Sequence, residues 1–588
     1  MDQAKNRNYK LKNLIPFLLL FVFCLSYFSS LGDYITYYQE KNSLFVFSKD
    51  YLVSHLIQPG ALLIYVGNFL TTFFYYPLTG AVVIALLISF SGYMVSKITN
   101  ILAGKISWSI TLLFSAVLFY FQTSYQFPVF NIAGLTLQLV LFFLLIKYSE
   151  LWWGIILFPV WYYITGAYSL VFILLVTTRI LSGSLKKEWF KIIILFATGS
   201  LTIFILEEYI LFQTFGALLK YPVPENTSGL QTNLFMLFLL ITGLLPLFAK
   251  IRIVRLTGNF RNRRLFILIP PVTLLVLLIF ISITRFDKRT RQYFHCERLF
   301  INGRFNQVVD YNIKHPSNNV LTIFLNNIAL CETGSLNDQL FSFRQDPEGS
   351  TLFLKWEMSA EILRRGGYFY YAIGMINEAH RWAYENMIMK GLRPEDLKML
   401  VKTELIDGNY AMASKYINIM KRTIFYREEA EKYDKYVADN NSIEKDPELS
   451  LKRKEEIHHD FFSITDNPLV NVERILSLDS VNHKAYEYKL AFMLLRKDYQ
   501  GIEGELKNLE KQGFQRIPVH IDEATEAYRI LKLGPVQEQG FLKPDPRTAI
   551  RFRQFLQTFQ QNGNNLKSAE PVLRRQFGNT FWYYAFYR

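Results

Sequence analysis

The sequence has few cysteines. Only three occur among 588 residues, at Cys24, Cys296 and Cys331. Cys24 lies within an apolar run, and the other two can pair only if their half of the chain faces an oxidising compartment. We expect all three to be free and buried, so cysteine usage says little about where the protein resides.

Motifs for common cofactors are also missing. The chain has no phosphate-binding Gly-Lys-Ser/Thr loop, no dinucleotide-binding glycine fingerprint and no spacing typical of zinc ligands. The run Glu455-Glu-Ile-His-His-Asp460 has the composition of a metal site. However, adjacent side chains on a helix point about 100° apart and cannot easily share one ion. We expect a solvated helix there, and no cofactor is predicted.

Charge is scarce in the first half of the chain. Residues 1–283 hold 20 Lys and Arg and 9 Asp and Glu, whereas the remaining 305 residues hold 44 and 40. The net charge of +15 therefore comes mostly from basic residues that lie between apolar runs. This pattern indicates a polytopic membrane protein followed by a soluble domain, and it argues against a nucleic-acid partner.

Nine apolar runs are read as transmembrane helices, each of which needs about twenty residues. They lie near 13–32, 60–78, 80–98, 107–122, 128–147, 151–182, 190–211, 231–249 and 265–283. The sixth run is too long for one straight helix, because about thirty residues at about 1.5 Å each exceed a hydrocarbon core of about 30 Å. Pro159 and Gly166 are expected to kink it or to divide it into two half-helices. Tight turns are predicted at 76–80 and 126–128.

Basic residues set the orientation of such a protein. With nine crossings, 14 Lys and Arg collect on the side of the N-terminus and 6 on the other side. This predicts an inner-membrane protein with a cytoplasmic N-terminus, so that loop 33–59 and the whole second half are extracytoplasmic. The basic residues at 285–291 contradict this orientation, because they would lie on the extracytoplasmic side. If residues 151–182 crossed the membrane twice, these basic residues would become cytoplasmic, but the other basic residues would then be distributed less favourably between the two sides. The basic start, 1–12, has no small-x-small cleavage site after it, which predicts an uncleaved anchor.

The second half is predicted to be helical, because apolar residues recur at three and four positions. We expect a linker at 284–300, a helical domain at 301–535, and a C-terminal helix with an aromatic tail at 536–588. Seven of the last twelve residues are aromatic. They are expected either to dock on the helical domain, which we favour, or to lie in the membrane interface.

One short pattern, Gly-x-aromatic-x-x-small/apolar, recurs in the second half. The copies are Gly303-Arg-Phe-Asn-Gln-Val308, Gly367-Tyr-Phe-Tyr-Tyr-Ala372 and Gly408-Asn-Tyr-Ala-Met-Ala413, with a weaker copy at Lys497-Asp-Tyr-Gln-Gly-Ile502. In each, a turn residue is predicted to begin a helix. The pattern resembles degenerate tetratricopeptide-type repeats, which implies a stack of helix pairs that binds a peptide or protein partner. A helical bundle without regular repeats is the alternative.

Acidic residues follow the first predicted span, in Ser29-Ser-Leu-Gly-Asp-Tyr-Ile-Thr-Tyr-Tyr-Gln-Glu40, with Asp50 further on. A long first extracytoplasmic loop with carboxylates, followed by a multi-pass bundle and a soluble domain, resembles the plan of GT-C-type membrane glycosyltransferases. The resemblance implies a lipid-linked sugar donor. It also implies that Asp33 or Glu40 is a general base or a ligand of a divalent metal, and that His55 contacts phosphate.

The chain departs from that family in several respects. The loop has no Asp-Asp, Asp-x-Asp or Glu-x-Asp pair, and Trp152-Trp153 is followed by Gly154 rather than by an acid. Glu207-Glu208 is a second acidic site near the end of a span. The other interpretation is that Asp33, Tyr37, Tyr38 and Glu40 form an interfacial belt and a helix terminus.

The sequence therefore predicts an all-α protein with a transmembrane bundle at 1–283 and a tetratricopeptide-like helical domain. The expected function is that of an interaction scaffold or assembly factor in the cell envelope, in contact with membrane lipids and with a protein or peptide partner. The alternative is a GT-C-like glycosyltransferase.

Overall fold

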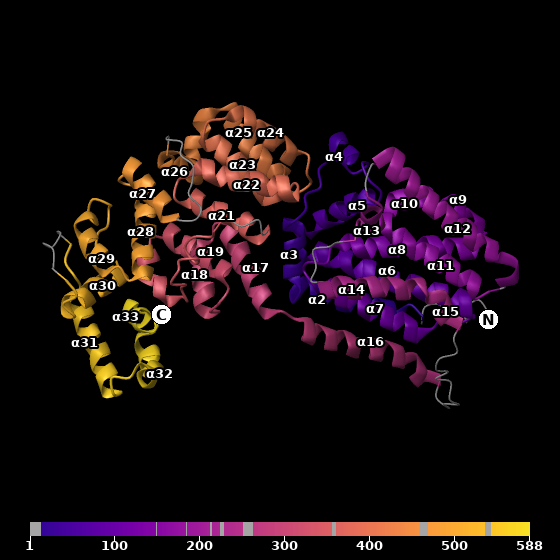
Figure 1. Cartoon of the computed structure of the whole chain (residues 1–588), viewed down its shortest axis with the longest axis horizontal. Helices are drawn as coiled ribbons and strands as arrows, with labels where there is room; N and C mark the ends of the chain where they lie inside the picture. Colours follow the sequence, from indigo (N-terminus) through magenta and orange to yellow (C-terminus); the bar gives the residue numbers. More distant parts are fainter. Residues whose placement is uncertain are drawn as a thin grey trace. The chain divides into compact units, whose positions relative to one another are not determined.

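The computed structural model of the protein describes residues 13–148, 150–183, 185–211, 214–223, 229–250, 263–355, 360–457, 468–534 and 542–588 (Figure 1). Every regular element in these ranges is a helix, and they contain no strand, so the predicted all-α class is confirmed. The chain divides into two units. The first comprises Met1–Asp287 and Arg422–Arg427, and the second comprises Lys288–Lys421 and Glu428–Arg588.

The first unit contains the apolar helices. Its α-helices are α2 (Ile15–Ser30), α3 (Asp33–Lys41), α4 (Lys49–Ser54), α5 (Ala61–Thr72), α6 (Pro77–Ala103), α7 (Trp108–Gln122), α8 (Val129–Tyr148), α9 (Leu151–Ile156), α10 (Phe158–Thr165), α11 (Ser169–Leu181), α12 (Leu185–Ile205), α13 (Phe215–Lys220), α14 (Gly229–Gly243), α15 (Leu245–Lys250) and α16 (Arg263–Arg285). Helix α6 packs against α2, α7 and α8. Small residues allow this close packing. A Cβ on Gly92 would collide with the Ser115 hydroxyl of α7, and the Ser91 hydroxyl lies 2.5 Å from that of Thr136 in α8.

All nine predicted apolar runs are helical, but they differ in length. Four helices are long and apolar enough to cross a membrane: Pro77–Ala103, Val129–Tyr148, Phe158–Leu181 and Glu188–Leu211. Six qualify if two bent pairs each count as one span; the pairs begin with Ile15–Ser30 and with Ile269–Arg285. The apolar helices Ala61–Tyr75, Trp108–Gln122 and Gly229–Gly243 are shorter. Fifteen residues rise only about 22 Å, less than a hydrocarbon core of about 30 Å. Nine spans thus remain a prediction.

The sixth predicted run is broken where its sequence indicated. Helix α9 ends at Ile156, α10 begins at Phe158 with Pro159 in its first turn, and α10 ends at Thr165. Gly166 has φ +57°, and a Cβ there would lie 2.6 Å from the Tyr221 carbonyl oxygen. Only glycine fits this position, and α11 begins three residues later, at Ser169. The predicted turn at 126–128 precedes α8, which begins at Val129. The bounds of the turn predicted at 76–80 are wrong, because residues 77–80 already form the first turn of α6.

The second unit consists of shorter helices. They are α17 (Lys288–Ile301), α18 (Phe305–Lys314), α19 (Val320–Glu332), α20 (Leu336–Gln339), α21 (Ala360–Ala372), α22 (Ile376–Lys390), α23 (Pro394–Ile406), α24 (Tyr410–Lys421), α25 (Arg427–Ala438, which begins on the last residue of the first unit), α26 (Pro447–Glu455), α27 (Pro468–Leu478), α28 (His483–Arg496), α29 (Tyr499–Glu505), α30 (Val519–Ile530), α31 (Pro546–Gln561), α32 (Leu566–Phe577) and α33 (Phe581–Tyr587). Helices α21, α22, α23 and α24 pack in succession, each against the next (Figure 1).

One backbone turn joins many of these helices into hairpins. A residue with positive φ stands two positions before the second helix of each pair: Gly303, Gly334, Gly374, Gly408 and Lys497. The following residue donates its N–H to a carbonyl five positions earlier, as Arg304 does to Leu299 and Asn409 to Glu404, at 3.0 and 2.8 Å. This is the Schellman arrangement, which satisfies carbonyls at the end of the first helix.

The predicted turn residues Gly303, Gly408 and Lys497 are confirmed, but the prediction for Gly367 is wrong. Gly367 lies inside α21. Its neighbour Gly366 has no room for a Cβ, because the Trp382 ring of α22 covers it. The turn lies instead at Gly374, where Ile376 replaces the expected aromatic residue. Gly303, Gly334, Gly374 and Gly408 then follow one another at intervals of 31 to 40 residues.

Two further expectations concern the ends of the second unit. Most of the expected linker 284–300 is the helix α17, whose Glu297 carboxylate is buried 2.7 Å from the Arg365 guanidinium of α21. The aromatic tail docks on the helical unit, as we favoured. Phe581 and Trp582 are buried, and the Trp582 indole donates to the Glu523 carbonyl of α30 at 2.7 Å. The three cysteines are free and buried, as expected.

The hairpin turns predict a ranking of glycine substitutions. Gly408 has φ +74° and open space where a Cβ would lie, so Gly408→Ala should cost only the left-handed strain of about 1–2 kcal/mol, and Gly408→Asn less. Gly374→Ala should cost more, because its Cβ would also collide with the Glu455 carbonyl. Thermal unfolding of the purified chain in detergent measures this order. Equal midpoints for Gly374→Ala and Gly408→Asn would contradict it.

Candidate functional site

The two carboxylates predicted as catalytic lie on one helix. Asp33 occupies the first turn of α3, directly after the Gly32 N-cap, and is half-buried. Glu40 lies near the end of the same helix and is 6% exposed. Seven residues along an α-helix correspond to about 10 Å, so the two carboxylates share a face but are two turns apart. They do not form a close pair.

The Glu40 carboxylate is occupied by two side chains. The Tyr426 hydroxyl donates to Glu40 Oε1, and Lys41 Nζ lies 3.3 Å from Glu40 Oε2. Lys41 Nζ also donates to the Tyr426 hydroxyl oxygen at 3.1 Å. An acid, a base and a phenol thus form a closed, buried group. Its charges are compensated, as a buried ion pair requires.

Tyr426 belongs to 422–427, the short segment that is part of the first unit. The Phe425 ring stacks on that of Tyr75, with centroids 4.9 Å apart and planes at 10°. The Phe47 N–H donates to the Arg422 carbonyl at 2.8 Å. Aromatic packing and a backbone hydrogen bond therefore hold the phenol over Glu40. In this arrangement Glu40 is a structural partner rather than a base open to substrate.

The remaining predicted residues have separate local partners. His55 Nδ1 lies 2.8 Å from the Tyr51 carbonyl oxygen, one turn earlier on α4. Glu207 accepts the Phe215 N–H at 3.0 Å, at the start of α13. Such contacts are typical of helix ends. His458, His459 and Asp460 lie outside the described residues, and the described ranges hold no group of three or more potential metal ligands.

The contact between Glu40 and Tyr426 predicts a coupled loss of stability. Tyr426→Phe removes the hydroxyl donor from a buried carboxylate and should destabilise the protein by about 1–3 kcal/mol. Combining it with Glu40→Gln should cost less than the sum of the two single changes. Tyr76→Phe is the matched control, because Tyr76 also packs against Phe425 but is 54% exposed. Unfolding midpoints in detergent measure the cycle, and strict additivity would argue against the contact.

The second unit contains buried acids with raised pKa values. Burial raises the pKa of Asp396 to about 6, although the Asn386 amide donates to it at 2.8 Å. Burial also raises the pKa of Glu487 in α28 to about 8, against its ordinary 4.5. Perturbed acids are often functional when they lie in a cleft. Neither residue lines the cavities described below, so both are assigned to the packed interior.

Glu487 gives the second unit a pH-dependent stability. Because its pKa is higher in the folded state, the folded protein keeps a proton that the unfolded chain releases above about pH 4.5. Stability should fall by up to about 1.4 kcal/mol per pH unit between there and about pH 8. Glu487→Gln should therefore raise the unfolding midpoint at pH 8 and leave it nearly unchanged at pH 5.

Glu505 provides a control of opposite sign. Burial opposes the shift, but hydrogen bonds from Lys489, Asn508 and Tyr486 outweigh it and lower the pKa of Glu505. Glu505→Gln should consequently destabilise the protein at neutral pH and have a smaller effect in acid. If Glu487→Gln instead lowered the midpoint at pH 8, the buried acid would be ionised and stabilising.

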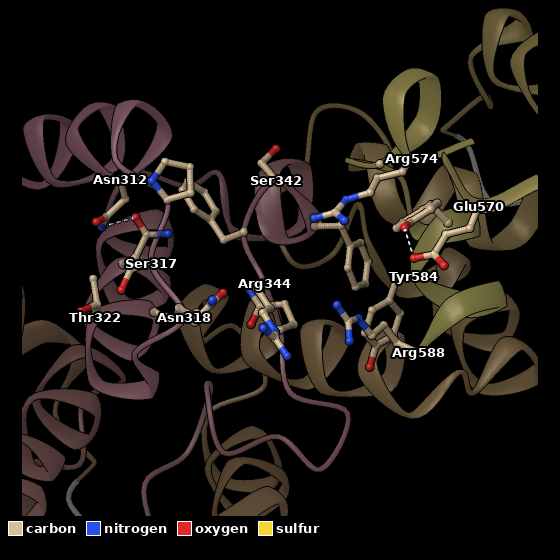
Figure 2. Close-up of a pocket in the computed structure, with 18 residues that line it drawn as sticks. Asn312, Ser317, Asn318, Thr322, Ser342, Arg344, Glu570, Arg574, Tyr584 and Arg588 are labelled. Atoms are coloured by element: carbon tan, nitrogen blue, oxygen red, sulfur yellow. Dashed lines mark hydrogen bonds between the residues drawn. The ribbon is translucent and has the colours of Figure 1, made fainter. Parts of the chain in front are cut away.

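A polar cavity of about 330 Å³ lies in the second unit, between α18–α19, the segment 341–345 and the C-terminal helices α32–α33 (Figure 2). Three arginines line it: Arg344, Arg574 and Arg588. Their side chains reach into the same opening in Figure 2. Within the part of the chain that the structure describes, none of the three has a carboxylate partner within 4 Å. With Glu570 as the single carboxylate of the lining, the cavity carries an excess of positive charge.

An amide cluster forms the opposite wall of this cavity. The Asn312 amide of α18 donates to Asn326 Oδ1 of α19 at 2.9 Å. Asn312 Oδ1, Asn326 Nδ2 and the Thr322 hydroxyl are buried and have no hydrogen-bond partner among the described residues. Most buried polar atoms in native proteins are paired, so three orphans in one cavity wall need an explanation.

Aromatic rings close the floor. The Tyr584 ring stacks on that of Phe341, with centroids 4.6 Å apart, and the Tyr584 hydroxyl donates to the Leu495 carbonyl at 2.9 Å. Tyr583 reaches Glu570, the one carboxylate of the lining, at 3.5 Å. These contacts hold the floor rigid. The arginines come from positions 344, 574 and 588, and sequence reasoning did not single them out.

These observations define an all-α protein with candidate membrane-spanning helices in one unit, and helical hairpins and a basic cleft in the other. Residues 7–588 match the family described as Family of unknown function (DUF6057). The chain belongs to this family. No curated protein and no solved structure matches it.

Proposed function

We propose that the protein is an integral inner-membrane protein of the cell envelope whose second unit binds a partner, so that it acts as an interaction scaffold or assembly factor. The single observation that carries the proposal is the cleft at Arg344, Arg574 and Arg588, a preformed concave site with unpaired charge. Concave sites with a few convergent polar groups are the usual places of ligand binding.

The hairpin architecture supports a binding role. The hairpin turns at Gly303, Gly334, Gly374 and Gly408 are consistent with the proposed resemblance to tetratricopeptide-type repeats. Such repeats present extended surfaces to partners. The lining of the cleft includes neither histidine nor cysteine within the described residues.

The proposed orientation follows from the distribution of basic residues. The N-terminus would be cytoplasmic and the second unit extracytoplasmic if the chain crosses the membrane nine times. Four to six helices have the length and composition of spans by themselves. The shorter α5, α7 and α14 would have to complete the crossings together with their flanking segments.

A GT-C-like glycosyltransferase with a lipid-linked sugar donor is the second candidate. An apolar cavity of about 520 Å³ between α7 and α14 favours it, because its lining suits a hydrocarbon chain. Asp33 would be the base or metal ligand, since Glu40 is held by Tyr426 and Lys41. Neither carboxylate lines this cavity.

One experiment separates the two functions. A photo-crosslinking amino acid placed at Ser342, which lines the cleft and is exposed, should yield a defined adduct in living cells. The adduct should disappear in the Arg344→Gln/Arg574→Gln/Arg588→Gln variant and persist in Asp33→Asn. The transferase instead predicts that Asp33→Asn abolishes an envelope glycan while the protein level is unchanged.

Lys435 on α25, exposed in the same unit, is the control position for the crosslinker. An adduct of equal yield there, or one that survives the triple substitution, would remove the cleft from the proposed function. Unchanged glycans in Asp33→Asn would remove the transferase.

A further inference from the structure

The lining of the cleft indicates the chemistry of its ligand. Guanidinium groups bind carboxylate and phosphate through paired, charge-assisted hydrogen bonds. Arg344, Arg574 and Arg588 are exposed, unpaired among the described residues and directed into one opening (Figure 2). Each is therefore available to an anion. A single carboxylate in the lining, Glu570, leaves the opening with excess positive charge.

Uncharged hydrogen-bonding side chains are unusually dense beside these arginines. Amides and hydroxyls come from Asn312, Ser317, Asn318, Thr322, Asn326 and Ser342. Asn326 Nδ2 offers an unused donor, Asn312 Oδ1 an unused acceptor and the Thr322 hydroxyl both. Asn312, Thr322 and Asn326 are 1–4% exposed. A ligand with many hydroxyl groups, or water molecules that it orders, can both donate to the unused acceptors of this wall and accept from its unused donors.

A packed aromatic floor supports the polar wall. Tyr584 is buried, stacked on Phe341 and fixed by its hydrogen bond to Leu495. These contacts position the neighbouring residues of the cleft before a ligand enters, which lowers the entropy lost on binding.

The cleft continues into a second cavity of about 530 Å³. The two share Asn318, Ile323, Arg344, Gln345 and Arg588. The second is also lined by Ser350, Thr351, Tyr587 and one carboxylate, Asp346, which accepts hydrogen bonds from Ser350. Arg344 and Arg588 thus stand at the junction of both cavities. A ligand of several linked units fits such a continuous groove better than one compact ion.

We propose that this groove binds an acidic saccharide, with its carboxylate or phosphate held by Arg344, Arg574 and Arg588 and its hydroxyls held by the amide wall. The inference rests on the proposed function, because it names the ligand of the same cleft. An acidic peptide is the competing ligand, because its backbone N–H and C=O groups also pair with amides, and failure of all the saccharide probes to bind would favour it.

Isothermal titration of the full-length protein in nanodiscs tests the proposal. The probes are trigalacturonate as the carboxylate, glucose 6-phosphate as the phosphate and maltotriose as the neutral saccharide. At least one acidic probe should bind about tenfold or more tightly than maltotriose, and its affinity should fall with added salt. The acidic probe that binds tells which anion the arginines select.

Arg575→Gln is the matched control for the three arginines. Arg575 follows Arg574 on α32 and is exposed, but does not line the cleft. Arg344→Gln, Arg574→Gln and Arg588→Gln should each weaken the acidic probe by about fivefold or more, and Arg575→Gln by less than about twofold. Equal binding of neutral and acidic probes, equal effects of Arg574→Gln and Arg575→Gln, or no binding at about 10 mM would each overturn the saccharide assignment. A cleft-specific adduct from Ser342 in cells would still support a partner of different chemistry.

Discussion

The need of every backbone amide and carbonyl for a hydrogen-bond partner constrains both units. In the first unit, apolar helices satisfy their backbone internally, which is the one way for a single segment to cross hydrocarbon. In the second unit, helices are short, and each end exposes carbonyls that need partners. The left-handed residues at Gly303, Gly334, Gly374, Gly408 and Lys497 satisfy those carbonyls and reverse the chain. The hairpins, and with them the cleft, depend on these turns.

Buried charge has different roles in the two units. Glu40 combines with Lys41 and Tyr426 in a closed group, and Glu297 combines with arginines of α21. Such groups are costly to disrupt and specify one arrangement of the chain. Arg344, Arg574 and Arg588 have no such partner among the described residues. Their exposure beside orphaned amides is the basis of the ligand that we propose for this cleft.

Several features could be predicted from residues that act locally. Helix breaks at Pro159 and Gly166, the turn at Gly408 and the burial of the terminal aromatics follow from side-chain and backbone preferences. The prediction of a turn at Gly367 was wrong because the pattern Gly-x-aromatic has two possible causes. The glycine can end a helix, or it can make room inside a helix for a neighbouring side chain. In the structure the Trp382 ring covers Gly366 and packs beside Gly367, and the turn lies at Gly374. The number of membrane spans is also ambiguous in the sequence. A fifteen-residue helix and a helix long enough to cross the membrane can have the same apolar composition.

The sequence by itself determined the all-α class, the apolar and charged halves and several helix breaks and turns, because these depend on residues close together in the chain. Tertiary structure alone decided the roles of the charged residues. The sequence left Glu40 either as a base or metal ligand or as part of an interfacial belt, and only the fold places the hydroxyl of Tyr426, distant in sequence, against it. The cleft could not be predicted from the sequence either, because its arginines come from three segments that only the fold brings together. Electrostatic and hydrogen-bond energies depend on distances between atoms in space, and only folding sets those distances.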